Sequence, residues 1–227
     1  IINNLVKPLW SKVKPLGSLT RLPGQSGYDT VVAQNGSSAY TAAASKRVAT
    51  AKAILTKYNF SASNPLPVNL VFSANDSLRL EEAKLIQNAA ADAGFKVTLS
   101  PTTTLGSARA NKTYDAHLYS WSRSDFGVTW AQKVFGYNTL RAEPRANNLI
   151  GYNNATLNGL VDKLETNLSS SELTKQTVVI EKVLYQDAVQ LSIYQHPVII
   201  ASNEAFKGLK VGQLAPNLVW NYWDWKY

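Results

Sequence analysis

Hydrophobic side chains recur with a helical period in the first half of the chain, which predicts two helices. The first covers residues 39–58, where Ser37 or Ser38 is expected to cap the free amides. The second begins after the capping triplet Asn75-Asp76-Ser77 and ends at Gly94, a residue type that favours the position after a helix. Its apolar stripe consists of Leu78, Leu85, Ile86, Ala89 and Ala93.

The same period predicts two further helices in the second half. One carries the stripe Leu157, Leu160, Val161, Leu164 and Leu168. The next is preceded by Ser169, with Glu172 three residues later, which is the spacing of a capping box. Its apolar positions continue through Leu173, Ile180, Leu184 and Leu191.

Short apolar runs bounded by turn-forming residues predict strands at Val68 to Phe72 and at Phe95 to Leu99. Strand, helix and strand follow one another closely, so we expect parallel strands joined by a right-handed crossover. The third strand of this sheet is predicted at Ala116 to Trp121, and another at Val198 to Ala201. The pattern therefore predicts an α/β fold.

The remaining segments lack a clear period. The first ten residues are interpreted as the end of a helix, and residues 8–38 as mostly loop because they are rich in Pro and Gly. The C-terminal segment NLVWNYWDWKY is strongly aromatic and almost without period. Such a surface is expected to pack against another part of a protein.

One stretch, Tyr114 to Asn153, concentrates aromatic, acidic and arginine side chains. Apolar walls with a few placed charges are typical of pockets for organic ligands. The alternative is that half of these aromatic side chains belong to the core and that the charges lie on a solvated loop.

Composition narrows the functional classes. A hydrophobic fraction of 45% with 17% charged residues is typical of a folded protein. The net charge of +8 raises the question of nucleic acid, but the basic residues are scattered singly and form no arginine-rich block. We therefore expect no nucleic-acid partner. The absence of Cys excludes disulfides, thiolate metal sites and a cysteine nucleophile.

Catalytic patterns are weak. Gly24-Gln25-Ser26-Gly27 lacks the spacing of a nucleophile elbow. Of the two His, His117 lies on a predicted buried strand, where a hydrogen-bonded core histidine is the commoner outcome, and His196 precedes a Pro. No metal-ligand spacing and no phosphate-binding loop occur, so no metal and no cofactor are expected. A carboxylate pair for glycoside chemistry stays open. The sequence favours binding over turnover.

With these residues in view, the chain resembles the C-terminal lobe of bacterial ABC-transporter solute receptors of the oligopeptide- and dipeptide-binding family. The segments that carry the resemblance keep the order of the family: PLGSLTRLPGQSGY (15–28), AAASKRVATAKAILTKYNF (42–60), VNLVFS (68–73), LRLEEAKLIQNAAADAGFKVTL (78–99), YDAHLYSW (114–121), NLIGYNNATLNGLVDKL (148–164) and LYQDAVQLSIYQHPVIIASNEAFKGLK (184–210).

The resemblance implies one lobe of a two-lobe, periplasmic-binding-protein-like fold with a mixed sheet and flanking helices. Residues 1–202 would form the ligand-binding lobe, and residues 203–227 the hinge and a tail that returns to a missing N-terminal lobe, with the hinge near Ala201 to Phe206. It implies an exported monomer, a lipoprotein or a periplasmic protein, that is not an enzyme. Such a receptor delivers peptides to an ABC permease in the membrane.

The resemblance also implies a ligand site. In the family, an Asp shortly after the Trp of the Tyr-Asp strand pairs with the α-ammonium group of the peptide, and that position corresponds to Asp125, with Ser124 beside it. Arg123 is a candidate for binding a ligand carboxylate in a bidentate manner, or else forms a surface ion pair. The apolar walls would come from Tyr119, Trp121 and Trp130.

Two alternatives stay open. A receptor of the same fold for another solute, such as an oligosaccharide, would use stacking aromatic side chains equally well. A secreted hydrolase would show turnover that depends on His117 or His196.

Overall fold

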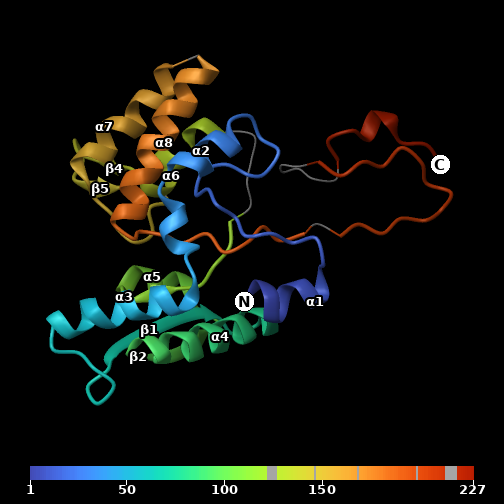
Figure 1. Cartoon of the computed structure of the whole chain (residues 1–227). Coiled ribbons are helices and arrows are strands. Elements are labelled where there is room, and N and C mark those ends of the chain that lie inside the picture. The colour runs from blue at the N-terminus through green and yellow to red at the C-terminus, as the bar shows by residue number, and fades with distance from the viewer. Residues whose placement is uncertain (122–126, 146, 168, 198, 213–218) are drawn as a thin grey trace. The chain divides into compact units, whose positions relative to one another are not determined.

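The computed structural model describes residues 1–121, 127–145, 147–167, 169–197, 199–212 and 219–227, and the fold is shown in Figure 1. The chain forms two compact units. Unit 1 comprises residues 1–12 and 36–119, and unit 2 comprises residues 13–35 and 120–227. Each unit combines segments that are distant in the sequence, so its core depends on tertiary contacts.

Unit 1 is built on a parallel sheet with the order β2-β1-β3. Strands β1 (Leu66–Ser73) and β2 (Phe95–Thr102) pair over their whole length, and β3 (Ala116–His117) pairs with the end of β1. The predicted βαβ unit is confirmed. The third strand is shorter than predicted because pairing stops at Val71 and His117, after which only the amide of Leu118 bonds to Val71.

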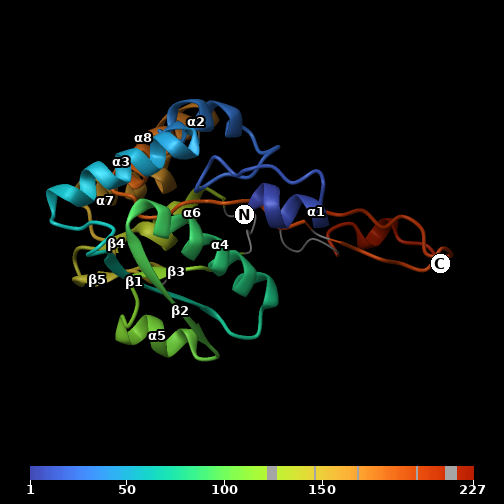
Figure 2. The same ribbon diagram turned by 60° about the horizontal axis from the view of Figure 1, so that its bottom comes forward.

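Two crossover helices cover the sheet of unit 1. Helix α4 (Ser77–Ala93) joins β1 to β2, and α5 (Leu105–Asn111) joins β2 to β3. The first crossover leads from β1 to β2 on one side, and the second leads from β2 past β1 to β3 on the other side. The two helices therefore lie on opposite faces of the sheet (Figure 2). Asp76 caps α4 by accepting from the amide of Arg79, and Gly94 follows with a φ of 102°. Both predicted ends of α4 are confirmed.

Helix α3 (Ala44–Lys57) packs against α4. It begins later than predicted, because Ser37–Tyr40 form a separate 3-10 helix, η2, after Gly36. The predicted capping by Ser37 or Ser38 is wrong: Ala43 stands at the cap position and makes no side-chain hydrogen bond there. The chain start is helical, as interpreted, with η1 (Ile2–Val6) followed by α1 (Lys7–Leu9).

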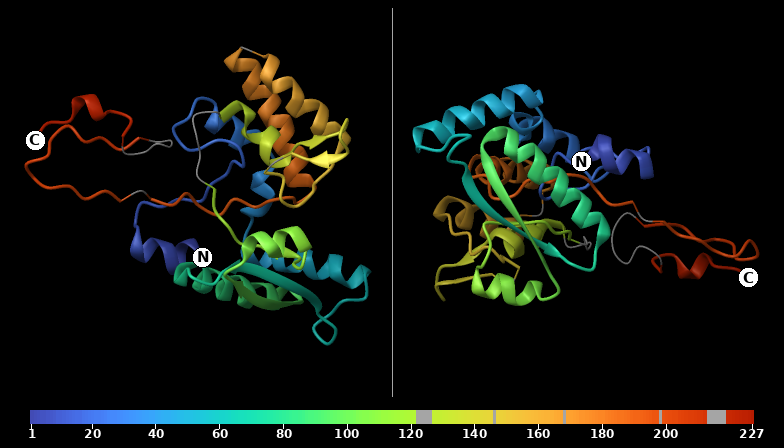
Figure 3. Two further views of the ribbon diagram at one scale, coloured as in Figure 1. Left: turned by 180° about the vertical axis from the view of Figure 1, so that it is seen from behind. Right: turned by 90° about the horizontal axis from the view of Figure 1, so that it is seen from below.

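Unit 2 is mainly helical. Helices α7 (Ala155–Lys163) and α8 (Ser170–Gln186) lie side by side (Figure 3), with α2 (Tyr28–Gln34) against α8 and α6 (Gly127–Phe135) against α7. The short strands β4 (Tyr137–Asn138) and β5 (Glu143–Pro144) form a hairpin after α6. The short 3-10 helices η3 (Leu164–Thr166) and η4 (Tyr222–Asp224) complete the unit. Its core contains Val31, Phe135, Leu157, Val161, Ile180 and Leu184.

Several predictions for unit 2 need correction. Helix α2 lies inside the stretch that was interpreted as loop, and α8 ends at Gln186 rather than near Leu191. Residues 199–201 form no strand, and Ile199 is 74% exposed, so no neighbouring strand covers it; Val198 lies outside the described residues. The predicted cap Ser169 is confirmed, because its side chain accepts from the amide of Glu172. None of the described helices is long and apolar enough to cross a membrane.

Candidate functional site

The aromatic stretch singled out in the sequence runs from unit 1 into unit 2. Residues up to Tyr119 belong to unit 1, and Ser120 opens the second part of unit 2. The site residues Arg123, Ser124 and Asp125 lie outside the described residues. The remaining predicted site residues therefore fall into two groups: Tyr119 lies in unit 1, and Trp121 and Trp130 lie in unit 2.

In unit 1 the aromatic group surrounds β3: Tyr114 precedes the strand, His117 lies in it and Tyr119 follows it. The rings of His117 and Tyr119 stack with centroids 4.9 Å apart, and Tyr114 approaches His117 from another side at 5.7 Å. All three side chains are half-buried. They form an apolar surface with a single titratable imidazole inside it.

The imidazole of His117 is kept neutral. Desolvation lowers its pKa to about 4, and the positive charges of Arg109 and Arg79 act in the same direction. Its Nε2 atom is buried and has no hydrogen-bond partner among the described residues, so the expected hydrogen-bonded core histidine is not found. An imidazole whose pKa is held at about 4 is a weak base, so His117 is poorly suited to general-base catalysis near neutral pH.

In unit 2 the corresponding group is a pair of tryptophans. Trp121 and Trp130 meet edge to face with ring centroids 5.4 Å apart, a geometry that the ring quadrupoles favour. Trp130 is carried by α6, whose residues Ala131, Val134 and Phe135 are buried and fix the helix in the core. Both indoles stay partly exposed, so the pair offers apolar surface to solvent.

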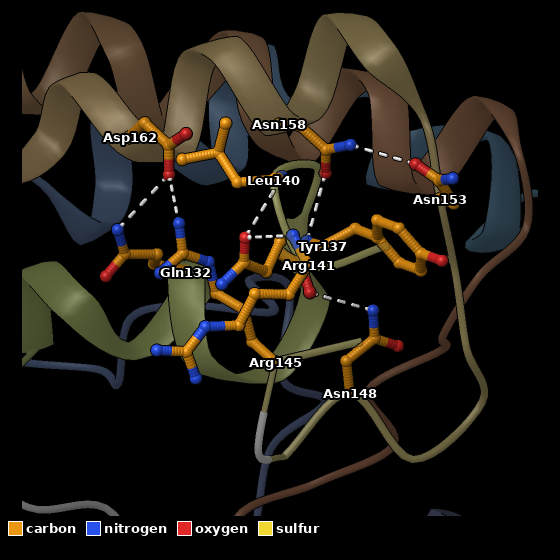
Figure 4. Close-up of polar contacts among 11 residues, drawn as sticks. Gln132, Tyr137, Leu140, Arg141, Arg145, Asn148, Asn153, Asn158 and Asp162 are labelled. Carbon is orange, nitrogen blue, oxygen red and sulfur yellow. Dashed lines mark hydrogen bonds and ion pairs between the residues drawn. The ribbon is translucent and has the colours of Figure 1, made fainter. Parts of the chain in front are cut away.

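A carboxylate on α7 links α6 to the segment after β5. Oδ1 of Asp162 accepts from Nη2 of Arg145 at 2.6 Å and from Nε2 of Gln132 at 3.3 Å (Figure 4). The buried Gln132 thereby finds a partner. Between α6 and β4, Gly136 leaves no room for a side chain, because a Cβ would clash with the carbonyl oxygen of Gln132.

Two buried asparagines hold the backbone around the β4–β5 hairpin. Asn148 donates to the carbonyl groups of Gly136 and Tyr152 at 2.9 and 2.7 Å and accepts from the amide of Tyr152. Asn158 accepts from the amide of Tyr137 and donates to Asn153 (Figure 4). These side chains replace ladder hydrogen bonds that short strands cannot supply. They anchor the backbone that follows α6, the helix that carries Trp130.

Sequence reasoning missed this polar support. Asn148, Asn158 and Asp162 all lie in the segment 148–164, whose resemblance to the family rested on a pattern from Gly151-Tyr152 to Leu160-Val161 that contains Asn158 but gave it no role. The available signal was the helical register, since Asn158 and Asp162 are four residues apart and neighbour the buried Leu157 and Val161. Polar residues at such positions must find partners.

The described residues contain no group of three or more His, Cys, Asp or Glu side chains that is arranged to hold a metal ion. His117 belongs to unit 1 and His196 to unit 2, where the ring of His196 lies 4.8 Å from that of Tyr194.

No family model matches the sequence, and no curated protein matches it. Solved structures do match. The periplasmic EDTA-binding protein EppA aligns with a TM-score of 0.76 and 19% identity over 96% of this chain and 41% of its own. NikA from Staphylococcus aureus, in complex with Ni(L-His)2, aligns with 0.58 and 21% over 72% and 35%. AppA from Bacillus subtilis, an oligopeptide-binding protein in complex with a nonapeptide, aligns with 0.53 and 18% over 70% and 31%.

The matched proteins are substrate-binding proteins of ABC transporters. At these identities the similarity establishes the fold, and the α/β, periplasmic-binding-protein-like fold with flanking helices that the resemblance implies is confirmed. The expected mixed sheet is found as a parallel sheet in unit 1 and a separate antiparallel hairpin in unit 2. The chain spans about a third to two-fifths of the length of these proteins, as the coverages of 31%, 35% and 41% show.

Proposed function

We propose that this chain is one lobe of an extracellular solute receptor that binds short peptides and delivers them to an ABC-type permease. The observation that carries the proposal is the alignment of 96% of the chain with 41% of a periplasmic binding protein. The tryptophan pair on a hydrogen-bonded support gives that fold a surface suited to an organic ligand. The proposal includes export from the cytoplasm, as a lipoprotein or a periplasmic protein, and no catalytic turnover.

Within this proposal, Trp121 and Trp130 form an apolar wall for the ligand, and Tyr119 contributes a further aromatic surface. Asp125 pairs with the peptide α-ammonium group, with Ser124 beside it, and Arg123 binds a carboxylate. A charge-assisted hydrogen bond of this kind contributes about 1.5–3 kcal/mol when it is shielded from water. Main-chain hydrogen bonds and the terminal charges would then select peptides without reading their sequence.

The proposed domain division assigns residues 1–202 to the ligand-binding lobe and residues 203–227 to the hinge and tail. The tail exposes large apolar side chains: Trp220 is 42%, Tyr222 65%, Trp223 66% and Tyr227 95% exposed. Exposed aromatic clusters of this kind usually meet a partner surface. We assign that surface to the N-terminal lobe of a longer protein.

Solutes other than peptides are the main alternative ligands for this fold. The matched structures include receptors for other solutes, among them agropinic acid for AgaA from A. tumefacien R10 and nickel with histidine for NikA. An oligosaccharide would also stack on a tryptophan pair. The distinction is therefore made by the ligand's charge: peptide recognition depends on the terminal ammonium and carboxylate groups, whereas sugar recognition does not.

The proposal is tested by following the six indole N–H signals of the 15N-labelled chain by NMR. We expect millimolar mixtures of free dipeptides to pentapeptides to shift the Trp121 and Trp130 signals in a saturable manner. One lobe supplies only part of the contacts of a closed cleft, so weak binding is sufficient. Trp121→Phe and Trp130→Phe assign the two signals, and the exposed Trp223 is the internal control.

Peptides that are both N-acetylated and C-amidated should bind more weakly than the free peptides. If neither indole responds to any peptide, peptide binding by this lobe is refuted. Oligosaccharides in the same titration then test the competing ligand class. Equal shifts of all six indoles would indicate non-specific adsorption and would also count against the proposal.

A further inference from the structure

Helix α3 presents a basic face to solvent. Its basic residues are Lys46, Arg47, Lys52 and Lys57, and the helix contains no acidic residue. Lys46, Arg47 and Lys57 are exposed and lie on one side of the helix around Thr50, because spacings of three, four and seven residues bring helical side chains to the same face.

Two large apolar side chains lie on the same face. Ile54 follows Thr50 by four residues, and Tyr58 follows Ile54 by four, directly after the end of the helix. They are 50% and 70% exposed. Leu55, on the side toward α4, is the only buried residue of α3 and lines the hollow between the two helices. One side of α3 therefore packs, while the other shows cations and apolar groups together.

The cations of this face keep their charge available. None of the ion pairs between described residues includes Lys46, Arg47 or Lys57. Arg47 donates from Nε to the carbonyl of Ala42 at 2.9 Å, which holds its side chain at the start of the helix. The carboxylate of Asp92 on α4 lines the hollow between α3 and α4, which these three cations do not line.

We propose that this face of α3 docks on the surface of an anionic phospholipid membrane. The lipid phosphates attract Lys46, Arg47 and Lys57, while Ile54 and Tyr58 enter the boundary between the headgroups and the acyl chains. A tyrosine suits that depth, because its ring is apolar and its hydroxyl group reaches water.

The combination of charge and apolar surface favours a membrane over other anionic partners. Apolar side chains among exposed lysines and arginines are typical of helices that lie on membrane surfaces. A nucleic acid would also attract the cations, but its phosphate backbone offers no apolar layer for Ile54, and the helix has no arginine-rich block.

This surface is separate from the proposed ligand site. None of its residues belongs to the aromatic groups assigned to the ligand, and the contact requires no peptide. For a receptor that works with a permease, as proposed above, it would keep the chain close to the membrane in which the permease lies. Membrane binding and peptide binding can therefore fail independently.

Sedimentation with vesicles tests the role of charge. The 227-residue chain is mixed at low ionic strength with vesicles of phosphatidylglycerol and phosphatidylcholine in equal parts, or of phosphatidylcholine alone. We expect binding to the anionic vesicles only, and its loss as the salt concentration rises. Lys46→Gln, Arg47→Gln and Lys57→Gln together should lower the partition coefficient about hundredfold, because each cation near such a surface contributes about fivefold.

The matched control combines Lys112→Gln, Lys163→Gln and Lys182→Gln. These lysines are exposed, lie outside α3 and take part in none of the ion pairs between described residues. The control has the same net charge as the test variant, yet its partition coefficient should fall by less than about threefold, since charges away from the contact are screened. Circular dichroism verifies that both variants fold.

A polarity-sensitive dye locates the contact. Because the chain has no Cys, Thr50→Cys provides a single attachment point in the basic face. The emission of the dye should rise and shift to the blue on anionic vesicles, whereas the same dye on Ser171→Cys, an exposed position of α8, should not respond. Ile54→Ser should weaken binding severalfold, and Val179→Ser, at an exposed position of α8, should leave it unchanged.

Four results would overturn the inference. They are an absence of binding to anionic vesicles, equal losses in the two triple variants, equal dye responses at Thr50 and Ser171, and tighter binding of the basic face to a DNA duplex than to the vesicles at the same ionic strength. The last would assign the surface to nucleic acid. None of them bears on peptide binding, so a failure here leaves the receptor proposal standing.

Discussion

A single buried carboxylate organises the N-terminal part of unit 2. Glu181 on α8 is fully buried. It accepts hydrogen bonds from the hydroxyl groups of Ser18 and Thr20 at 2.5 Å, from the amide of Thr20 at 2.8 Å and from Nδ2 of Asn35 at 2.7 Å. The buried carboxylate is thus satisfied by donors from the loop before α2 and from the end of α2. These hydrogen bonds join that loop and helix α2 to helix α8.

We predict that Glu181→Ala lowers the free energy of unfolding by about 2–4 kcal/mol, because it leaves these donors buried without their acceptor. Urea denaturation followed by tryptophan fluorescence measures the effect. Lys182→Ala, at the exposed neighbouring position of α8, should change stability by less than about 0.5 kcal/mol. A similar loss in both variants would mean that the helix, and not the carboxylate, is responsible.

A second prediction at the residue scale concerns pH. Because the pKa of His117 is about 4 in the folded chain and near its ordinary value of 6.5 in the unfolded chain, the unfolded state binds this proton first. Stability should therefore fall as the pH drops from about 6.5 toward about 4. His117→Asn should lose part of this fall, whereas His196→Asn should keep it. Denaturation midpoints at several pH values provide the comparison, and identical profiles for wild type and His117→Asn would refute the assignment.

At the scale of elements, helix ends depend on identifiable side chains. The carboxylate of Asp76 accepts from the amide of Arg79 at 3.0 Å and so satisfies one of the free amides at the start of α4. Helix α4 carries the crossover between the two long strands, so its first turn also positions the loop after β1. Capping at this point therefore supports the sheet as well as the helix.

We predict that Asp76→Ala reduces the free energy of unfolding by about 1 kcal/mol, the usual contribution of a helix cap. Asp76→Asn keeps the accepting oxygen and should retain most of the stability. Asn75→Ala, one residue earlier and exposed, should have almost no effect. Thermal unfolding measures all three variants, and equal losses for the Ala and Asn variants at 76 would assign the effect to charge instead of capping.

At the scale of the whole molecule, the tail is held by its own small polar centre. Asn221 is fully buried, donates to the carbonyl of Gly208 at 2.6 Å and accepts from the amide of Lys210 and from the indole of Trp225. Lys207 and Lys226 form an antiparallel bridge. The tail is thus folded on itself while its aromatic side chains still face solvent.

We predict that replacing Tyr222 and Trp223 by Ser lowers the fluorescence of a bound hydrophobic dye substantially and changes the free energy of unfolding by less than about 0.5 kcal/mol. Both side chains are mostly exposed, at 65% and 66%, so their loss removes little packing. Phe206→Ser is the contrasting variant, because Phe206 packs against Trp225 at 5.3 Å and is needed for the tail itself. Unchanged dye binding in the double variant would show that the exposed apolar surface lies elsewhere.

The sequence by itself determined the elements whose signals are local. The βαβ unit, the caps at Asp76 and Ser169 and the stop at Gly94 follow from periodicity and from side-chain hydrogen bonds between near neighbours. These features depend on few residues, so a single sequence is enough to predict them.

Tertiary structure decided what depends on distant partners. Helix α2 forms within a segment rich in turn residues because its Val31 enters the core and its C-cap Asn35 bonds to Glu181, about 150 residues later in the chain. The third strand is short because its pairing with β1 stops at Val71 and His117, although β1 continues to Ser73. Ser37 caps nothing in α3 because the chain first turns through a 3-10 helix. The polar support of Trp130 depends on Asn148, Asn158 and Asp162, whose partners lie on other elements. Local patterns contain no information on such contacts, because burial is shared between segments that meet only in the folded chain.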